Sequence, residues 1–443
     1  MKLNKETYTF IDLFAGAGGL SEGFIRAGYE PIAHIEMDHY ACDSLRTRAA
    51  FHYLNDNGQL NIYEEYLKNK KEKTDGTWLW NKVPKHIIES VIQEAIGKET
   101  LPILFGKVDK LCNGKKIDLI IGGPPCQAYS VAGRARLGRK IEQDPRNDLY
   151  KFYVEFLKRY KPKMFVFENV LGILTAKGGE PFKDLMRLVR ELDYEIDFRE
   201  QIASQHGVLQ KRHRVIIVGW QNKRETSENT TYHYPQLGEE EQHYKIMKDL
   251  FCDLPIINAG EGSLCGPVYY TKSLKDMEYL QKSNIRGVMN FTTQHIARPT
   301  NSIDREIYKQ AVELWNEGKR LRYDKLDPSL QKHKNKQTFL NRFCVVDPNG
   351  VCHTVVAHIA MDGHYYIYPT PNPTIENVRS ISIREAARIQ SFPDDYFFEG
   401  CRSAAFKQIG NAVPVVLAEK IALEIKKILL MKMKYEKLKT TNA

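Results

Sequence analysis

The chain has 443 residues, of which 42% are hydrophobic and 27% charged, a balance that is ordinary for a soluble globular protein. No apolar run approaches the roughly 18 residues of a membrane span, and the amino end lacks a signal segment, so we expect a cytoplasmic protein without a membrane partner. Eight cysteines without a C-x-x-C pair argue against a disulfide framework and against a zinc site, and the net charge of +10 favours a polyanionic partner.

The first predicted element is a strand over residues 8–13, which a glycine-rich turn over residues 14–21 joins to a helix. Such turns bring backbone N–H groups close to a ligand at the amino end of a helix. The next predicted strand, residues 31–35, ends in Glu36, 20 positions after Gly16. A carboxylate at that distance typically binds ribose hydroxyls, so the two features favour a ligand that contains adenosine.

Residues 52–105 contain a charged segment and no pattern with readable chemistry, so we expect a surface insertion there. A buried parallel strand is predicted over residues 117–121, and two glycines and two prolines end it just before Cys126. Ligands bind at the carboxyl ends of strands in open α/β sheets, which favours a chemical role for this thiol over that of a buried structural cysteine. Cations crowd the loop that follows and favour contact with a phosphate backbone. They are Arg134, Arg136, Arg139, Lys140 and Arg146.

A helix predicted over residues 149–160 precedes another buried strand, residues 164–167, which ends in Glu168. Taken alone, a carboxylate at a strand end is more often a cap or an ion-pair partner. Here the strand end delivers Glu168 to the side of the sheet that Cys126 occupies. The combination of a candidate nucleophile and a carboxylate favours a catalytic role for both.

An amphipathic helix is expected over residues 182–192 and an apolar strand over residues 214–218. From residue 220 to residue 378 the pattern becomes irregular and basic, with strand-like pieces such as residues 363–368. Between positions 286 and 342 we count twelve Lys and Arg against six Asp and Glu. This stretch predicts a separate, mostly β or irregular domain inserted into the α/β domain.

The helical pattern resumes over residues 384–391, and residues 408–414 open a long helix that reaches about residue 434. No internal repeat interrupts the chain. The carboxyl-terminal part therefore belongs with the α/β domain that precedes the irregular stretch.

Taken together, these segments resemble the DNA cytosine-5 methyltransferase family of the bacterial restriction-modification type. The motifs stand in the family's order, and the resemblance covers residues 8–219 and 379–425. The segments that carry it are Phe14-x-Gly16-x-Gly18, Pro125-Cys126-Gln127, Glu168-Asn169-Val170, Gln210-x-Arg212-x-Arg214, residues 379–393 and Gly410-Asn411. Ser382 stands where the family commonly has Thr, and the segment over residues 354–357 is similar to the family's Thr-Leu-x-Ala.

The resemblance implies a Rossmann-like α/β methyltransferase domain that depends on S-adenosylmethionine, formed by residues 1–219 and 379–443. It implies that residues 220–378 form a smaller target-recognition domain, mostly β or irregular, while residues 52–105 keep an unknown role. The expected activity is methylation of carbon 5 of a cytosine flipped out of a specific duplex DNA sequence. The expected protein is a monomer without a metal, associated with the bacterial nucleoid, and a cognate restriction endonuclease acting separately is a candidate partner.

The resemblance also assigns residues. Cys126, held by Pro125, would add to carbon 6 of the ring and Glu168 would serve ring nitrogen 3, while Arg212 and Arg214 bind oxygen 2 and orient Glu168. Glu36 would bind the ribose of the cofactor, with the adenine next to Met37 and Asp109. The full set for the cofactor is Phe14, Ala15, Gly16, Gly18, Gly19, Leu20, Glu36, Met37, Asp109, Pro124, Asn411 and Val413. The set for DNA is Gln127, Ser130, Arg134, Arg136 and Arg146.

Three alternatives stay open at this point. One branch of the family methylates cytosine in transfer RNA, but its Cys-Phe-Thr signature is missing from the variable region here. A catalytically silent DNA-binding regulator would have lost the Cys or the Glu, and Cys126 and Glu168 are both present. A nucleotide-dependent oxidoreductase would explain the glycine-rich turn and leave the other motifs without a purpose.

Overall fold

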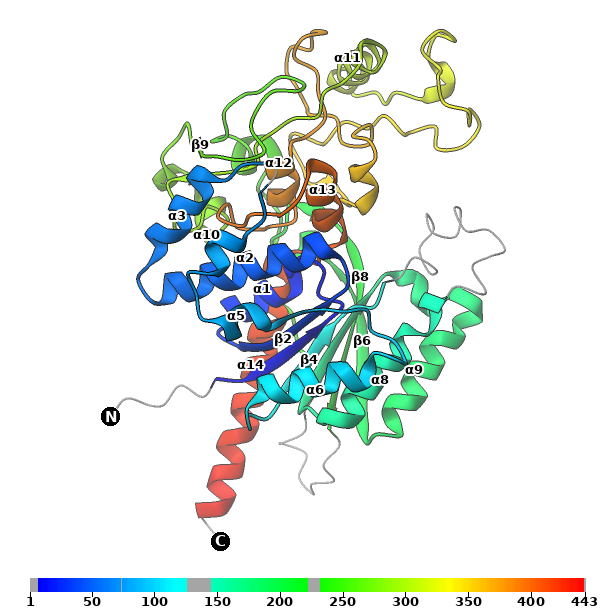
Figure 1. Cartoon of the computed structure of the whole chain (residues 1–443). Helices are drawn as coiled ribbons and strands as arrows, with labels where there is room; N and C mark the ends of the chain where they lie inside the picture. Colours follow the sequence, from blue (N-terminus) through cyan, green and yellow to red (C-terminus); the bar gives the residue numbers. More distant parts are fainter. Residues whose placement is uncertain (1–6, 73, 126–144, 222–231, 442–443) are drawn as a thin grey trace.

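The computed structural model describes residues 7–72, 74–125, 145–221 and 232–441. A twisted seven-stranded sheet with helices on both faces forms one part, which we call the sheet domain, and an upper lobe of loops and short helices stands above it (Figure 1). In the described ranges no helix is long and apolar enough to cross a membrane.

The strands are β1 (Thr9–Leu13), β2 (Glu30–Glu36), β3 (Val91–Gln93), β4 (Leu119–Gly122), β5 (Met164–Asn169), β6 (Tyr194–Ile202), β7 (Gln210–Lys211), β8 (His213–Gln221), β9 (Val268–Tyr269), β10 (Phe291–Thr292) and β11 (Cys352–His353). The helices of the sheet domain and its neighbourhood are α1 (Gly19–Arg26), α2 (His39–Asp56), α3 (Leu60–Asn69), α4 (Thr77–Trp80), α5 (Lys85–Glu89), α6 (Leu101–Cys112), α8 (Leu149–Tyr160) and α9 (Glu180–Arg190). Those that follow are α10 (Glu278–Lys282), α11 (Ser302–Asn316), α12 (Ile383–Ile389), α13 (Arg402–Asn411) and α14 (Val415–Thr441).

The large sheet has the order β3-β2-β1-β4-β5-β8-β6. Its first five strands are parallel, and β8 runs antiparallel to both β5 and β6. Because β8 runs opposite to β5, the start of β8 lies beside the end of β5, with Glu168 opposite Ile216 and Asn169 opposite Val215. The antiparallel strand therefore brings residues near its own beginning to the edge of the sheet where the parallel strands end.

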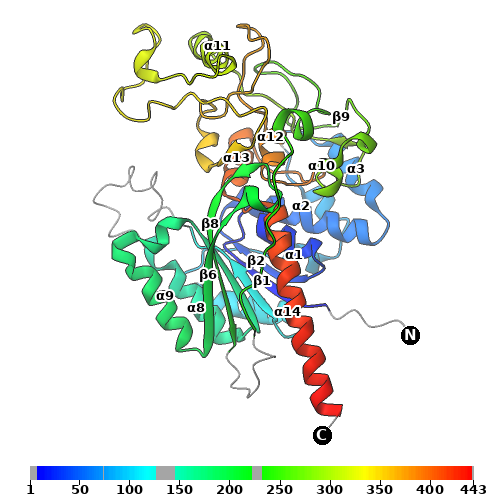
Figure 2. The ribbon, with the colours of Figure 1, turned by 180° about the vertical axis from the view of Figure 1, so that it is seen from behind.

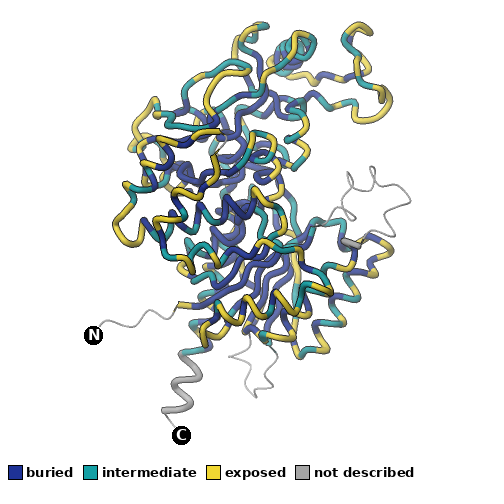
Figure 3. Tube along the Cα trace, viewed as in Figure 1, coloured by how far each residue is buried: buried dark blue, intermediate teal, exposed yellow. Residues whose placement is uncertain are grey.

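Side chains of the central strands alternate between two apolar layers. In β4, Ile120 packs with α6, α8 and α9, whereas Leu119 and Ile121 pack on the opposite face with α1 and α14. Figures 1 and 2 show these two helical layers from the front and from behind, and Figure 3 shows the buried strands between them. The alternation fixes the register of the strand, since a slip by one residue would exchange the two faces.

Most of the predicted elements of the sheet domain are present. The expected strands over residues 8–13, 31–35, 117–121, 164–167 and 214–218 correspond to β1, β2, β4, β5 and β8. The expected helices over residues 149–160 and 182–192 correspond to α8 and α9. The edge strand β6 was missed because charged residues occupy much of it, as is common where a strand faces solvent at a sheet edge.

The prediction that residues 52–105 are only a surface insertion is wrong. This stretch contains β3, whose backbone pairs with β2, and α3 to α5, which share one apolar core with α2 and Phe397. The Tyr63 hydroxyl donates to the Asp395 carbonyl oxygen at 2.8 Å, and Lys70 forms a buried ion pair of 2.8 Å with Glu399. The segment is thus part of the core of the sheet domain.

The upper lobe, formed mainly by the chain between β8 and α12 (Figure 1), has little regular structure in its described part. Residues 363–368, expected as a strand, form turns and two isolated bridges, from Ile367 to Val345 and to Ser380, while the 15-residue helix α11 was not expected. One apolar core joins residues of the lobe, such as Leu250 and Val346, to Ile383 and Phe392. The last two belong to residues 379–441, which we call the carboxyl-terminal block. A second, smaller core surrounds α11.

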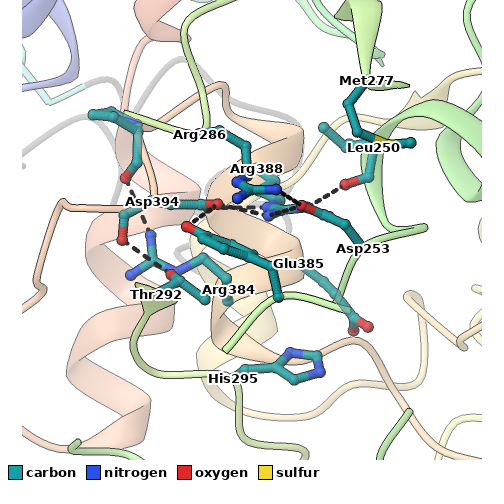
Figure 4. A network of polar contacts seen from close by, with 12 residues as sticks. Leu250, Asp253, Met277, Arg286, Thr292, His295, Arg384, Glu385, Arg388 and Asp394 are labelled. Atoms are coloured by element: carbon teal, nitrogen blue, oxygen red, sulfur yellow. Dashed lines mark hydrogen bonds and ion pairs between the residues drawn. The ribbon is translucent and has the colours of Figure 1, made fainter. Parts of the chain in front are cut away.

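A buried ionic network fastens the lobe to α12 (Figure 4). Arg388 donates to Asp253 and to Asp394, each at 2.6 Å, and all three side chains are almost fully buried. Arg286 forms a second ion pair of 3.0 Å with Asp253. Charges this deep are tolerated because each has an opposite charge within hydrogen-bond distance.

We predict that Asp253→Ala destabilises the protein by about 3–5 kcal/mol, because it leaves Arg388 and Arg286 buried without their shared carboxylate. Thermal or urea unfolding of the purified variant measures the change. Lys85→Ala, which breaks a pair whose lysine is 88% exposed, is the control and should shift stability by about 0–1 kcal/mol. Equal stability of the two variants would contradict the role given to the network.

Candidate active site

The glycine-rich turn after β1 leaves room for a ligand. Its backbone adopts positive φ angles at Phe14 (57°), Gly16 (55°) and Gly18 (74°), and Gly18 occupies the N-cap of α1. A Cβ placed on Gly16 would meet no atom within 4 Å, so this side of the turn is open. The turn therefore presents backbone groups and the amino end of a helix to an unobstructed space.

Glu36 at the end of β2 closes the turn from the other side. Its Oε2 accepts a hydrogen bond from the Gly16 N–H, and its Oε1 accepts from the N–H groups of Met37 and Asp38, all at 2.8 Å. Burial raises the pKa of Glu36 above its ordinary value, although the three donors oppose this shift. The neighbouring Met37 side chain is 68% exposed, so an apolar surface is available beside the carboxylate.

The carboxyl-terminal block forms a further wall of the turn. A Cβ on Gly19 would lie 2.3 Å from the Val413 carbonyl oxygen, which shows how closely the segment after α13 approaches α1. Leu20 is buried, Ala15 donates its N–H to Ile35 at 3.1 Å, and Asn411 is exposed at the end of α13. The predicted cofactor residues of the two ends of the chain thus lie side by side.

Asp109 is the exception, and its assignment to the cofactor is wrong. It lies in α6, where it is paired with Arg159 and accepts a hydrogen bond of 3.0 Å from the Tyr160 hydroxyl. Tyr160 ends α8 just before β5 begins, so Asp109 lies at the edge of the sheet opposite the strand ends. The Arg159 hydrogen bond lowers the pKa of Asp109.

The residue beside Glu36 is instead Glu94, which follows β3 and donates its backbone N–H to the Glu36 carbonyl oxygen at 2.9 Å. Little in the sequence indicates Glu94, because β3 has only three residues. A short apolar pair before a carboxylate was the one available signal.

Glu168 and Arg214 form the charged centre at the other end of the site. Arg214 Nε lies 2.5 Å from Glu168 Oε1, and the two side chains are 12% and 14% exposed. The pair forms because β8 starts where β5 ends. Among the described residues, Arg214 contacts one of the two carboxylate oxygens, Oε1.

The loop after β4 lies against this carboxylate. A Cβ on Gly123 would be 2.7 Å from both the carbonyl oxygen and Oε2 of Glu168, so only glycine allows this approach. Asn169 donates its Nδ2 to the Pro124 carbonyl oxygen at 3.3 Å and so fixes the Pro-Pro segment. Pro125 is the last described residue of the loop. The candidates Cys126, Gln127, Ser130, Arg134 and Arg136 and the side chain of Arg146 lie outside the described residues.

Gln210 and Arg212 connect this centre with the upper lobe. Arg212 is buried and donates from Nη1 to the Val355 carbonyl oxygen at 2.7 Å, while the Val355 N–H donates to Gln210 Oε1 at 2.8 Å. On the other side of the same segment, a Cβ on Gly410 would lie 2.4 Å from the Ala357 nitrogen. Residues 354–357 therefore lie between the segment of Gln210 and Arg212 on one side and α13 on the other.

The site thus combines an open glycine turn bonded to the Glu36 carboxylate with a carboxylate–arginine pair that lies at a neighbouring strand end, beside Gly123. This arrangement is typical of α/β enzymes, in which ligands bind outside the carboxyl ends of the strands.

Comparison with known proteins identifies the family. The model of the C-5 cytosine-specific DNA methylases matches residues 8–76 and 106–427. The Type II methyltransferase M.Bpa9945I of Bacillus paralicheniformis is 35% identical over 95% of this chain and 98% of its own, and M1.HphI of Haemophilus parahaemolyticus is 28% identical over 95% and 87%. A crystal structure of a prophage-encoded DNA modification methyltransferase from E. coli shares the fold, with a TM-score of 0.59, 24% identity and coverage of 96% of this chain and 99% of that one. The chain belongs to the C-5 cytosine-specific DNA methylases.

We predict that Gly123→Ala lowers the methylation rate strongly while the protein stays folded, because the added methyl group must displace the Glu168 backbone or carboxylate. A methyl-transfer assay and a circular dichroism spectrum measure the two properties. Gly106→Ala is the control, since a Cβ there meets nothing within 4 Å and alanine favours the helix α6. Normal activity of Gly123→Ala would show that the close approach has no catalytic purpose.

Proposed function

We propose that this methyltransferase moves a methyl group from S-adenosylmethionine to carbon 5 of a cytosine within a specific duplex DNA sequence. The observation that carries the proposal is the Glu168–Arg214 pair, held at 2.5 Å against the loop that leads into Cys126. An acid and a cation at this place match the needs of a ring that must accept a nucleophile.

The residues around the glycine turn fit the proposed cofactor. The open side of Gly16 suits the methionine part, Glu36 has acceptor oxygens for ribose hydroxyls, and the exposed Met37 offers an apolar surface for adenine. Glu94 replaces Asp109 as our candidate for the adenine amino group. When bound, the cofactor supplies an electrophilic methyl group.

The protein's own contribution is to make carbon 5 of the cytosine nucleophilic. The ring is aromatic, so the Cys126 thiolate first forms a bond to carbon 6 and breaks the conjugation. Glu168 donates a proton or a hydrogen bond to ring nitrogen 3 and relieves the negative charge that the addition creates. Arg214 holds Glu168 in position and offers further N–H donors to oxygen 2. After methyl transfer, loss of the carbon 5 proton and of Cys126 restores the ring.

Carbon 6 is shielded in the duplex, so the target cytosine must leave the base stack. We assign the contacts around the extruded base to Gln127, Ser130, Arg134, Arg136 and Arg146, and the reading of base edges to the target-recognition domain, residues 220–378. The names of the Type II relatives support a role in a restriction-modification system, with a cognate endonuclease acting separately. We propose a monomer associated with the nucleoid.

Cys126 should become covalently attached to DNA that carries 5-fluorocytosine at the target, because fluorine blocks the final elimination. The complex should survive denaturing electrophoresis with the wild type and be absent with Cys126→Ala, which still binds DNA. The target itself is found by bisulfite sequencing of DNA from cells that express the chain. An active wild type without adduct would disprove the nucleophile, and an inactive wild type that binds DNA would favour the silent regulator.

We predict that Glu168→Gln lowers the single-turnover methylation rate at least about 100-fold, since a positioned proton donor contributes about 100- to 10,000-fold. The amide keeps the shape of the side chain, so affinity for DNA should change little. Rapid-quench methyl transfer with saturating S-adenosylmethionine and a DNA titration measure the two quantities. Glu89→Gln, on the surface helix α5, is the matched control and should leave both unchanged. A rate within a few-fold of the wild type would return Glu168 to a structural role.

A further inference from the structure

One loop of the upper lobe is built as an exposed projection. Residues 328–342 contain no Asp or Glu but carry Lys332, Lys334, Lys336 and Arg342. All three lysines are exposed, and near the tip the Phe339 side chain is 62% exposed. The segment stands away from the rest of the molecule at the top right of Figure 1, where Figure 3 shows mostly exposed chain.

The base of the projection is held by Tyr323, which is fully buried. Its N–H donates to the Leu340 carbonyl oxygen at 2.8 Å, and its hydroxyl oxygen accepts from the His333 N–H at 2.7 Å. Tyr323 thus holds the two sides of the loop together through these two hydrogen bonds. Residues 334–339 extend beyond them.

A second set of contacts shapes the tip. Arg342 lies over the Tyr323 ring at 4.1 Å and donates to the carbonyl oxygens of Asn335 and Thr338 at 2.7 Å and of Phe339 at 3.0 Å. This bonding holds Phe339 at a φ of 55°, a left-handed conformation that is uncommon for a bulky residue. The Arg342 guanidinium thus fixes the shape of the tip through its hydrogen bonds to three backbone carbonyl oxygens.

The Phe339 ring is 62% exposed and is not part of the apolar core that surrounds α11. Water is an unfavourable environment for the ring, and the surrounding lysines repel one another in the free protein. Both costs are removed by a partner that is a polyanion and has flat apolar surfaces between its charges. Duplex DNA, the substrate class of this family, is such a partner, and apolar side chains that enter a base step are a known way to unstack it.

We propose that residues 332–342 form a DNA-insertion element, in which Lys332, Lys334 and Lys336 bind backbone phosphates and the Phe339 ring enters the base stack next to the target cytosine. This inference rests on the proposed methylation of duplex DNA and adds the residue that opens the stack. The phosphate contacts position the loop, and the inserted ring compensates for lost stacking where the duplex is distorted.

The test uses the full-length protein and duplexes that carry the recognition sequence found by bisulfite sequencing, with 2-aminopurine placed in turn at each position flanking the target. The wild type should raise the fluorescence at one of these positions, because the inserted ring unstacks that base. Phe339→Ala should lose this signal and bind DNA on the order of tenfold more weakly, whereas Phe339→Trp should keep both properties. Met431→Ala, which removes a side chain 66% exposed on α14, is the control and should behave as the wild type.

The double variant Lys334→Gln, Lys336→Gln should weaken binding to all sequences and reduce the slope of log affinity against log salt by about one per lost phosphate contact. Phe339→Ala that binds and unstacks like the wild type would overturn the proposal, as would weaker binding with an unchanged fluorescence pattern. Covalent capture of 5-fluorocytosine DNA by Phe339→Ala at high protein concentration separates these outcomes from a failure of the methylation chemistry itself.

Discussion

The Glu168–Arg214 ion pair depends on the antiparallel pairing of β8 with β5. In a fully parallel sheet the start of β8 would lie at the far edge, and Arg214 would be a strand length away from Glu168. Antiparallel pairing instead puts Arg214 Nε 2.5 Å from Glu168 Oε1, where the two side chains are only 12–14% exposed. In such a partly buried place the attraction between the two charges is stronger than it would be in water, so the carboxylate has one defined position.

Glycine at position 123 and asparagine at position 169 complete this arrangement. The glycine lets the loop after β4 touch the Glu168 carboxylate, and the asparagine ties the Pro124 carbonyl to the end of β5. Two neighbouring strand ends are thereby locked together, one bearing the acid and the other leading to the cysteine. The backbone thus sets the position of the Glu168 carboxylate relative to the Gly123–Pro124 segment, and the addition that we propose would use this pre-set arrangement.

The same edge is linked to the upper lobe. Gln210 and Arg212 form hydrogen bonds with Val355, and Gly410 packs on the Ala357 nitrogen. Residues 354–357 therefore contact both the segment that precedes β8 and the helix α13. The Arg388–Asp253 ion pair fastens another part of the lobe to α12. The lobe is thus attached to the sheet domain at two places.

Sequence reasoning succeeded where a motif and a strong period coincide. The strand ends at Glu36 and Glu168 were predicted because apolar runs lead directly into a carboxylate, and the structure places both at the expected edge. Asp109 was misplaced because β3 is only three residues long, so the true strand end at Glu94 carried almost no signal.

The upper lobe could not be predicted well because tertiary contacts, rather than local patterns, determine its shape. Tyr323 illustrates this, since its hydrogen bonds to His333 and Leu340 close a loop that no hydrophobic periodicity in the sequence predicts. The expected strand over residues 363–368 failed for the same reason, because its alternation reflects packing of turns on α11 and the carboxyl-terminal block.

The central claim is that this site makes carbon 5 of cytosine reactive by adding a nucleophile at carbon 6. The most direct measurement is the release of tritium into water from duplex DNA that carries 5-tritiated cytosine at the target, in the absence of any methyl donor. Addition of the thiolate turns carbon 5 into a centre that exchanges its hydrogen, so the wild type should release tritium and Cys126→Ala should release none. Exchange that persists in Cys126→Ala, or its absence in a wild type that methylates DNA, would contradict the account.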